Sequence, residues 1–239
     1  MPIKAVLFDM FDTLMLIEKN HEFYSPSLMR MYRYLNKNGI DVQFEKFSEA
    51  YIEARDCLYA KADLTFEEPH FNVRVSQALK SLGYNYEVSS LLVNAATSEF
   101  CEEFMKYVRI DENAKVILNR LHGKYKLAIV SNFAIPECVH KLLRTDDLDR
   151  LFEVVVVSAA VNKRKPCPEI FQAALKALGV SVSEAVFVGD TIDADVEGPK
   201  GLGMKTIYIE RRVQKASERF CPDQTIKSLI ELPQALETC

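Results

Sequence analysis

Polar side chains that can do chemistry stand at the ends of short apolar runs in this sequence. Asp9 ends the first run, Ser131 and Asn132 end a second, and Asp190 follows a third. A carboxylate can serve as a covalent nucleophile, and two carboxylates brought together can hold a hard divalent cation. Lys165 can balance negative charge beside them. Taken singly, such residues also make helix caps and turns, so the hypothesis of a catalytic site depends on the whole set.

Five short apolar runs predict the strands that would position these residues. They are rich in Val, Ile, Leu, Phe and Tyr and mostly lack polar alternation, as in strands buried on both faces. The runs cover residues 4–9, 126–131, 152–158, 184–189 and 205–210. Helical segments are expected at about 111–122, 136–144, 168–178 and 194–201. This alternation predicts an α/β fold with a doubly wound parallel sheet, whose ligands bind beyond the carboxyl ends of the strands.

The stretch at 15–106 breaks the alternation and predicts an inserted α-helical cap domain. The catalytic α/β core would then consist of residues 1–14 and 107–239. Ser25 and Pro26 should open the first cap helix, and Gly39 should end it. Three further cap helices are expected at about 45–61, 71–82 and 88–105, and one amphipathic helix at 225–237 should return to the sheet.

Composition and charge indicate which binding partners and which cellular compartment to expect. The 239 residues carry a net charge of −4 and a pI near 5.7, which does not favour nucleic acid or an anionic membrane as the main partner. No apolar run approaches the ~20 residues of a membrane span, and the first apolar run is too short for a secretion signal. The six cysteines show no C-x-x-C pair, so we expect free thiols and a cytoplasmic protein. The basic residues 163–165 and 211–212, apart from Lys165, are expected to be solvated charges.

Four motifs, in the right order along the chain, carry a family resemblance. They stand at residues 8–14 (FDMFDTL), 130–132 (VSN), 165–171 (KPCPEIF) and 188–198 (VGDTIDADVEG). With these motifs the chain resembles the haloacid dehalogenase-like hydrolase superfamily, in the branch whose helical cap follows the first strand. The resemblance spans nearly the whole length and implies a Rossmann-like core.

The resemblance implies a magnesium-dependent hydrolase acting on a small phosphorylated substrate. Asp9 would attack phosphorus and form an aspartyl-phosphate. Mg²⁺ would be held by the Asp9 carboxylate, the main-chain carbonyl of Phe11 and the Asp190 carboxylate. Asp195 would orient the waters on the metal, whereas Asp193 is expected to be a helix cap or a solvated acid.

Other residues of the motifs would bind the reacting phosphoryl group. Lys165 would neutralise charge on the pair formed by Asp9 and the phosphate. Ser131, the backbone amide of Asn132 and Thr13 would donate hydrogen bonds to the transferring oxygens.

The sequence departs from the family pattern at Phe11, where related phosphatases carry a second aspartate that acts as general acid and base. Loss of such a group costs on the order of 10²–10⁴ in rate. Asp12 occupies the next position, but in extended backbone its side chain points to the opposite face. The substrate could have a leaving group that needs little protonation, another group could supply the proton, or turnover could be slow. Glu67, Glu68 and His70, in the inter-helix loop at 67–70, could supply that proton, although we expect this loop to be solvated and without a catalytic role.

Two alternatives remain open at this stage. A metal-independent 2-haloacid dehalogenase also carries an aromatic residue at the position of Phe11, but Asp190 beside Asp9 without a cation would form a costly like-charge pair. A weakly catalytic protein that binds phosphorylated ligands or a partner chain is the second alternative. Among the cap arginines, Arg30, Arg33 or Arg74 could face the substrate. The protein is expected to be a monomer or a homodimer.

Overall fold

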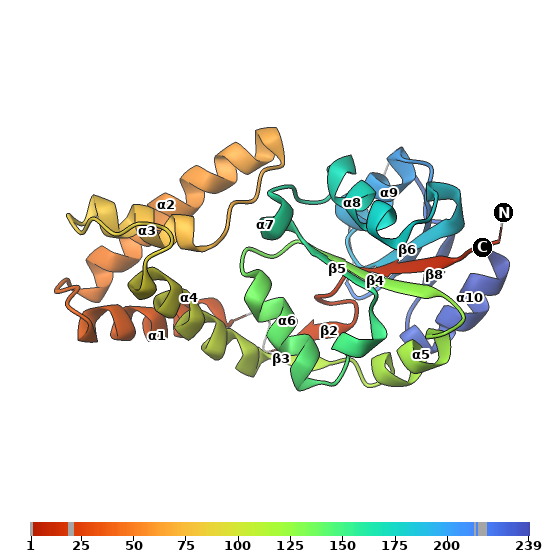
Figure 1. Ribbon diagram of the computed structural model, residues 1–239, viewed down its shortest axis with the longest axis horizontal. Coiled ribbons are helices and arrows are strands. Elements are labelled where there is room, and N and C mark those ends of the chain that lie inside the picture. The colour runs from red at the N-terminus through yellow and green to blue at the C-terminus, as the bar shows by residue number, and fades with distance from the viewer. Residues whose placement is uncertain (1, 19–21, 213, 215–218) are drawn as a thin grey trace.

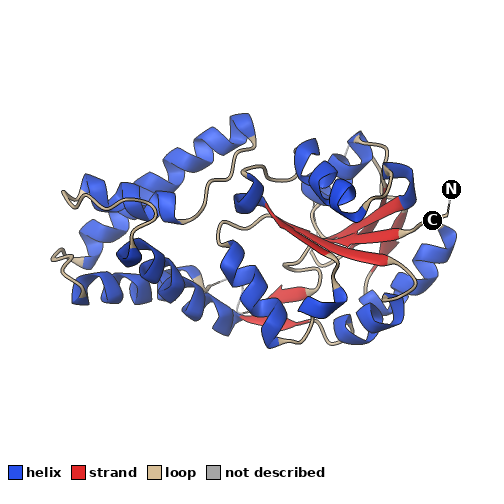
Figure 2. Cartoon of the chain, in the orientation of Figure 1, coloured by secondary structure: helices blue, strands red, loops and turns tan. Residues whose placement is uncertain are grey.

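The computed structural model describes residues 2–18, 22–212, 214 and 219–239, and a six-stranded parallel sheet forms its centre (Figures 1 and 2). The strands are β1 (Ala5–Phe8), β4 (Lys126–Ser131), β5 (Val154–Val157), β6 (Ala185–Gly189), β7 (Lys205–Ile209) and β8 (Gln224–Ile226). Their order across the sheet is β5-β4-β1-β6-β7-β8, and every neighbouring pair is parallel. The predicted α/β fold with a parallel sheet is confirmed.

Helices cover both faces of the sheet, which explains why the strands are apolar without alternation. In β1, Val6 and Phe8 point into one core, whereas Ala5 and Leu7 point into the other. The first core is completed by α5 (Ala114–Leu121), α6 (Pro136–Thr145) and α10 (Leu232–Thr238), and the second by α8 (Pro168–Leu178). Shorter helices are α7 (Ser158–Val161) and α9 (Gly198–Gly201). Single turns lie at Met105–Tyr107, Asp149–Leu151, Val182–Glu184 and Leu229–Glu231.

Four helices between β2 and β3 form a separate group beside the sheet, at the left of Figure 1. They are α1 (Tyr24–Lys37), α2 (Phe44–Thr65), α3 (Asn72–Ser81) and α4 (Leu91–Phe104), and we call them the cap. Gly39 follows α1 at φ 96°, a left-handed conformation that ends the helix, as predicted. The predicted N-cap at Ser25 is wrong, because α1 already begins at Tyr24.

Four short elements differ from the sequence predictions. Residues Met15–Ile17 (β2) and Val108–Ile110 (β3) form a two-stranded antiparallel ribbon, although no strand was expected in either segment. The helix predicted at 225–237 is wrong in its first half: β8 comes first, and α10 begins only beside Pro233, which favours the first turn of a helix. The helix predicted at 194–201 is a π-helix, Ile192–Glu197 (η5), that runs into α9.

A disulfide joins the cap to the core. Cys101 on α4 is bonded to Cys138 on α6, so the expectation of six free thiols is wrong for this pair. The two cysteines are 37 positions apart in the sequence, and only the packing of α4 against α6 brings them together. No helix in the described parts of the chain is long and apolar enough to cross a bilayer.

Candidate active site

The carboxyl ends of three adjacent strands bring the predicted catalytic residues to one edge of the sheet. In register, Phe8 at the end of β1 lies between Ile129 of β4 and Val188 of β6. Asp9 and Asp190 directly follow β1 and β6, and the Asp9 amide donates to the Val188 carbonyl at 2.9 Å. The order of the strands therefore makes neighbours of residues that are about 180 positions apart in the sequence.

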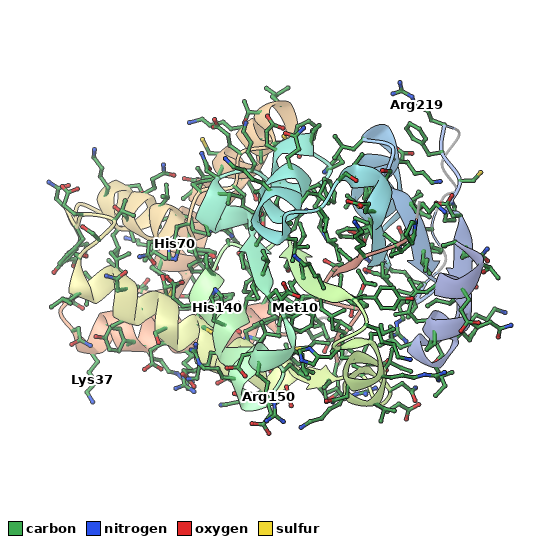
Figure 3. The ribbon with its side chains drawn as sticks, turned by 45° about the vertical axis from the view of Figure 1, so that its right-hand side comes forward. Met10, Lys37, His70, His140, Arg150 and Arg219 are labelled. Atoms are coloured by element: carbon green, nitrogen blue, oxygen red, sulfur yellow. A yellow bond between two sulfur atoms is a disulfide. The ribbon has the colours of Figure 1, made fainter. Side chains whose placement is uncertain are left out.

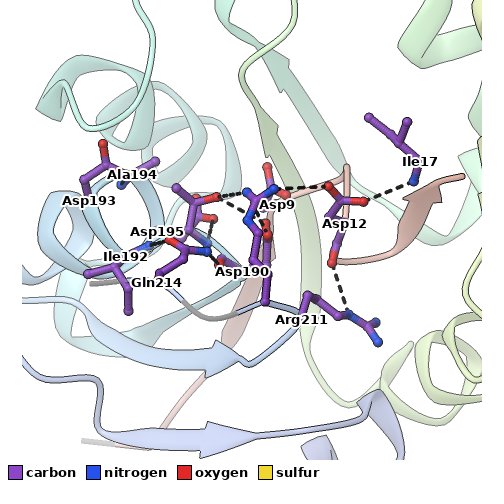
Figure 4. A network of polar contacts seen from close by, with 12 residues as sticks. Asp9, Asp12, Ile17, Asp190, Ile192, Asp193, Ala194, Asp195, Arg211 and Gln214 are labelled. Carbon is purple, nitrogen blue, oxygen red and sulfur yellow. Dashed lines mark hydrogen bonds and ion pairs between the residues drawn. The ribbon is translucent and has the colours of Figure 1, made fainter. Parts of the chain in front are cut away.

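A buried lysine, Lys165, links two carboxylates at this edge, those of Asp9 and Asp195, which are labelled in Figure 4. Lys165 Nζ donates to Asp9 Oδ1 at 2.6 Å and to Asp195 Oδ1 at 2.7 Å, and the lysine is only 3% exposed. Burial lowers the pKa of Lys165, but Asp195 and Asp9 more than offset it, so the net shift is upward. The Thr191 amide donates to the other oxygen of Asp195 at 2.9 Å. Lys165 therefore remains charged, and both oxygens of Asp195 are held in place.

Asp190 completes a cluster of three buried carboxylates. One oxygen from each of Asp9, Asp190 and Asp195 lies within 4.8 Å of the others. Burial first, and then the charges of Asp9 and Asp195, raise the pKa of Asp190 to about 7. Arg212 Nη2 lies 3.2 Å from Asp190 Oδ2, within ion-pair distance, yet this oxygen has no partner in hydrogen-bond geometry among the residues that the structure describes. Arg212 is half exposed, so solvent weakens its effect.

This cluster fits a hard divalent cation. Three carboxylates face one buried lysine and one half-exposed arginine, which leaves an excess of negative charge. Asp190 Oδ2, a buried oxygen without a hydrogen bond, is the type of ligand that Mg²⁺ prefers. Burial is also the main cause that raises the pKa of Asp195 to about 6.

A cavity of about 360 Å³ opens above the cluster. Its lining includes the predicted site residues Asp9, Phe11, Asn132, Lys165, Asp190 and Asp195, together with Asp12, Arg164, Thr191, Asp193, Ala194 and Arg212. Asp193 is exposed, and its Oδ1 accepts a hydrogen bond from the Ala194 amide at 2.9 Å. Thr13 and Ser131 do not line this cavity, but their buried hydroxyls have no hydrogen-bond partner in the described part of the chain.

The Asn132 side chain holds the backbone of Lys165. Its Oδ1 accepts from the Lys165 amide at 2.7 Å, and its Nδ2 donates to the Lys165 carbonyl at 3.0 Å. These two bonds connect the end of β4 to the loop before α8. The side chain of Asn132 thus positions Lys165, and its own backbone amide is the group available to a ligand.

Phe11 belongs to an aromatic wall on the cap side of the cavity. Its ring centroid lies 4.7 Å from that of Phe133 and 5.6 Å from that of Phe104 on α4. Asp12 also lines the cavity, but its Oδ2 lies 3.7 Å from Arg212 Nη1, so the carboxylate of Asp12 is paired with a cation. Its backbone is left-handed, with φ 58°, and its Oδ1 accepts from the Ile17 amide at 3.1 Å.

The cap loop at 65–71 docks on the core through Glu68 and His70, contrary to the expected solvated loop, whereas Glu67 is exposed as expected. Glu68 is buried and accepts a hydrogen bond from Ser158 Oγ at the start of α7. His70 Nε2 lies 3.0 Å from Glu137 Oε2 (His70 is labelled in Figure 3). The Arg164 amide also donates to the Phe66 carbonyl at 2.9 Å. Glu68 and His70 are thus engaged with the core, and neither lines the cavity above Asp9.

The segment after β7 holds site residues that the sequence did not reveal. Arg211, expected to be a solvated charge, instead donates to the Asp12 and Thr13 carbonyls at 3.1 and 3.0 Å and pairs with Asp111 at 2.7 Å. Gln214 donates to the Asp190 carbonyl. The position of these residues at the carboxyl end of a predicted strand was the one available signal.

Gly189 is required by the close approach of Asp195. A Cβ at position 189 would lie 2.4 Å from Asp195 Cγ, far inside contact distance. The Gly-Asp pair at the end of β6 is therefore needed for packing as well as for its carboxylate.

Comparisons with known proteins give the family of the chain. A glyceraldehyde 3-phosphate phosphatase from Pyrococcus abyssi is 31% identical, over 87% of this chain and 82% of the relative. The crystal structure of a HAD phosphatase from Thermococcus onnurineus is 26% identical, covers 98% of both chains and has a TM-score of 0.67. A 2-haloacid dehalogenase from Pseudomonas syringae pv. tomato shares the fold, with a TM-score of 0.74 and 24% identity over 98% of both chains. Residues 3–203 match the family described as haloacid dehalogenase-like hydrolase, and the chain belongs to that family.

Proposed function

We propose that the protein is a Mg²⁺-dependent phosphatase that acts on a small phosphorylated metabolite through an aspartyl-phosphate at Asp9. The observation that carries the proposal is the buried Asp9–Lys165–Asp195 chain beside Asp190, at the floor of the cavity. Relatives named glyceraldehyde 3-phosphate phosphatase support a substrate of this class.

Asp9 is the nucleophile in this proposal. Lys165 holds one oxygen of its carboxylate, and within the described residues the other oxygen accepts no hydrogen bond. That oxygen attacks phosphorus, the bond from phosphorus to the leaving oxygen breaks, and an acyl phosphate forms on Asp9. Water then attacks the same phosphorus and gives a proton to solvent, the bond from phosphorus to the Asp9 oxygen breaks, inorganic phosphate leaves, and the carboxylate is restored.

The remaining charges stabilise phosphoryl transfer. Magnesium, held by Asp9, the Phe11 carbonyl and Asp190, would offset the repulsion between the carboxylate and the phosphate. Lys165 supplies a fixed positive charge at Asp9, and Asp195 keeps that lysine in position. The free hydroxyls of Ser131 and Thr13 and the Asn132 amide are the proposed donors to the phosphoryl oxygens.

Phe11 determines which leaving groups the site can expel rapidly. An aromatic ring packed on Phe133 cannot donate a proton, and Asp12 is turned toward Ile17. The site therefore favours leaving groups of low pKa, such as those of acyl and aryl phosphates, over alkyl esters.

The proposal is tested with acetyl phosphate and p-nitrophenyl phosphate, in Mg²⁺ and in excess chelator. We expect turnover that depends on Mg²⁺ and falls at least ~10³-fold in Asp9→Asn, because the nucleophile is lost. Asp193→Asn, at an exposed acid of the same cavity, is the matched control and should retain activity within a factor of ~3. Full activity in chelator, or in Asp9→Asn, would refute the assignment.

The aromatic wall of Phe11, Phe133 and Phe104 favours one second candidate, dehalogenation, because a halide leaves without a proton. The buried Asp190 beside Asp9 opposes it, since the pair needs a cation. Halide release from 2-chloropropionate in chelator would support the dehalogenase instead.

A further inference from the structure

Arg74 on α3 is a buried cation without an anion. It is 5% exposed, among the described residues it forms no ion pair, and its Nε has no hydrogen-bond partner; its polar neighbours are the hydroxyls of Tyr59 and Tyr51. Its neighbours are aromatic rings, with Tyr59 at 5.3 Å and Phe71 at 4.8 Å from the guanidinium carbon to the ring centroid. Cation–π contact offsets only part of the loss of water around a guanidinium. The side chain therefore lacks a negatively charged partner.

Two tyrosine hydroxyls beside Arg74 are also without partners. The hydroxyls of Tyr51 on α2 and Tyr24 at the start of α1 are buried and lack hydrogen bonds in the described structure. Their ring centroids lie 6.2 Å apart. Burial raises the pKa of Tyr51 well above 10, and nearby Arg74 is the largest opposing influence. Buried polar atoms without partners are rare in native proteins, and here three donors gather in one place.

This group lies at the end of the cap that faces the core. Arg74 is in the first turn of α3, and the preceding Phe71 amide donates to the Ala134 carbonyl of the core at 2.8 Å. Tyr24 is the first residue of α1, only seven positions after the end of β2. A chain of aromatic contacts, Tyr24–Phe23–Phe104–Phe11, connects the group to the wall of the catalytic cavity.

Two other cap arginines, Arg30 and Arg55, are already neutralised, and Arg33 is exposed to solvent. Arg30 Nε pairs with Glu99 at 2.6 Å and its Nη1 with Glu103 at 3.4 Å. Arg55, which lies over the Tyr24 ring, pairs with Asp56 at 2.7 Å. One uncompensated charge remains near the tyrosines, which matches the single charge of a carboxylate better than a phosphate dianion.

We propose that Arg74, Tyr51 and Tyr24 bind a carboxylate of the substrate while its phosphoryl group lies at Asp9. The proposal rests on the phosphatase function above and names the substrate class as phosphorylated carboxylic acids. The guanidinium of Arg74 donates hydrogen bonds to both carboxylate oxygens, and the tyrosine hydroxyls donate further hydrogen bonds to the same group. The subsite acts in binding, so its loss changes KM more than kcat.

A matched pair of substrates tests the proposal. 3-Phosphoglycerate and glyceraldehyde 3-phosphate differ in having a carboxylate or an aldehyde at the end away from phosphorus. In Arg74→Met, which keeps the length of the side chain, we expect kcat/KM for the acid to fall ~10–100-fold through KM, and for the aldehyde to change less than ~2-fold. Tyr51→Phe should give a smaller loss of the same kind, and Arg33→Met, at an exposed cap arginine, none. Equal losses for both substrates, or no loss for the acid, would overturn the proposal.

Binding without turnover separates this proposal from the phosphatase assignment. Malonate should raise the melting temperature of the wild type and of Asp9→Asn, but not that of Arg74→Met. That result supports the subsite even if no phosphate ester is hydrolysed. A malonate shift that persists in Arg74→Met, or is absent from the wild type, rejects the subsite whatever the activity.

Discussion

The raised pKa values of the carboxylate cluster predict that the metal-free protein loses stability as the pH rises. Asp190 has a folded-state pKa of about 7 against an ordinary value of 3.8. Between these values the folded state binds more protons than the unfolded state, so the free energy of unfolding falls with pH. The stabilisation is complete below about pH 4 and is lost as the pH passes through 7. Asp195, with a pKa of about 6, contributes with the same sign.

The size of the effect follows from the shift of Asp190. About three pKa units, at 1.36 kcal/mol each, correspond to an upper limit of about 4 kcal/mol. Asp195 interacts with the same groups, so its shift is not simply added. For a chain of this length, 1 kcal/mol changes the melting temperature by roughly 2–4 °C, and we expect a decrease on the order of 10 °C.

Mg²⁺ should reverse this trend. A cation binds the deprotonated carboxylates, so it stabilises the folded protein most above pH 7 and least at pH 5. The assay is urea unfolding followed by circular dichroism between about pH 5 and pH 8, in chelator and in Mg²⁺. Glu184, whose pKa is lowered to about 2, titrates below this window and does not interfere.

Two asparagine variants identify the titrating group. Asp190→Asn cannot ionise, so its metal-free stability should be nearly independent of pH from 6 to 8, and Mg²⁺ should add little. Asp193→Asn, at an exposed residue three positions away, should behave as the wild type. Metal-free stability that rises with pH, or an unchanged slope in Asp190→Asn, would refute the reasoning.

Three further substitutions test other parts of the structure. Gly189→Ala should displace Asp195, lower stability by about 1–3 kcal/mol in denaturant melts and strongly reduce activity; wild-type behaviour would contradict the close contact. Phe11→Asp should raise the turnover of alkyl phosphates ~10–100-fold and leave the turnover of acetyl phosphate nearly unchanged, because only the alkyl leaving group needs a proton. Equal effects on both substrates would contradict this role of position 11. Cys138→Ser should lower stability by about 3 kcal/mol through loss of the bond to α4. Reductant should lower the stability of the wild type by the same amount and leave the stability of the variant unchanged.

The sheet and the edge that holds the acids were predictable because each depends on local pattern. Runs such as 184–189 are apolar throughout, as burial on both faces requires. Parallel pairing then places every carboxyl end on one side, so Asp9 and Asp190 had to converge once the strands were identified. No knowledge of distant contacts was needed.

The missed features depend on contacts between distant segments. β2 and β8 have three residues each, too few to show a period, and they exist because partner strands satisfy their backbones. The same holds for Arg211, whose polarity predicts solvent until the carbonyls of Asp12 and Thr13 lie beside it. The uncompensated charge of Arg74 is likewise visible only when all its neighbours are known.

The bond between Cys101 and Cys138 has a mechanical consequence for the cap. The β2–β3 ribbon and this bond fasten the helices along one border, the lower one in Figure 1. The opposite border is held by reversible contacts, among them the Arg164 amide to the Phe66 carbonyl. Because the cap is fixed along one border, we expect it to rotate about that border, so that the entrance for substrate opens on the side of residues 65–66. Reduction of the disulfide should allow the cap to move in other directions as well.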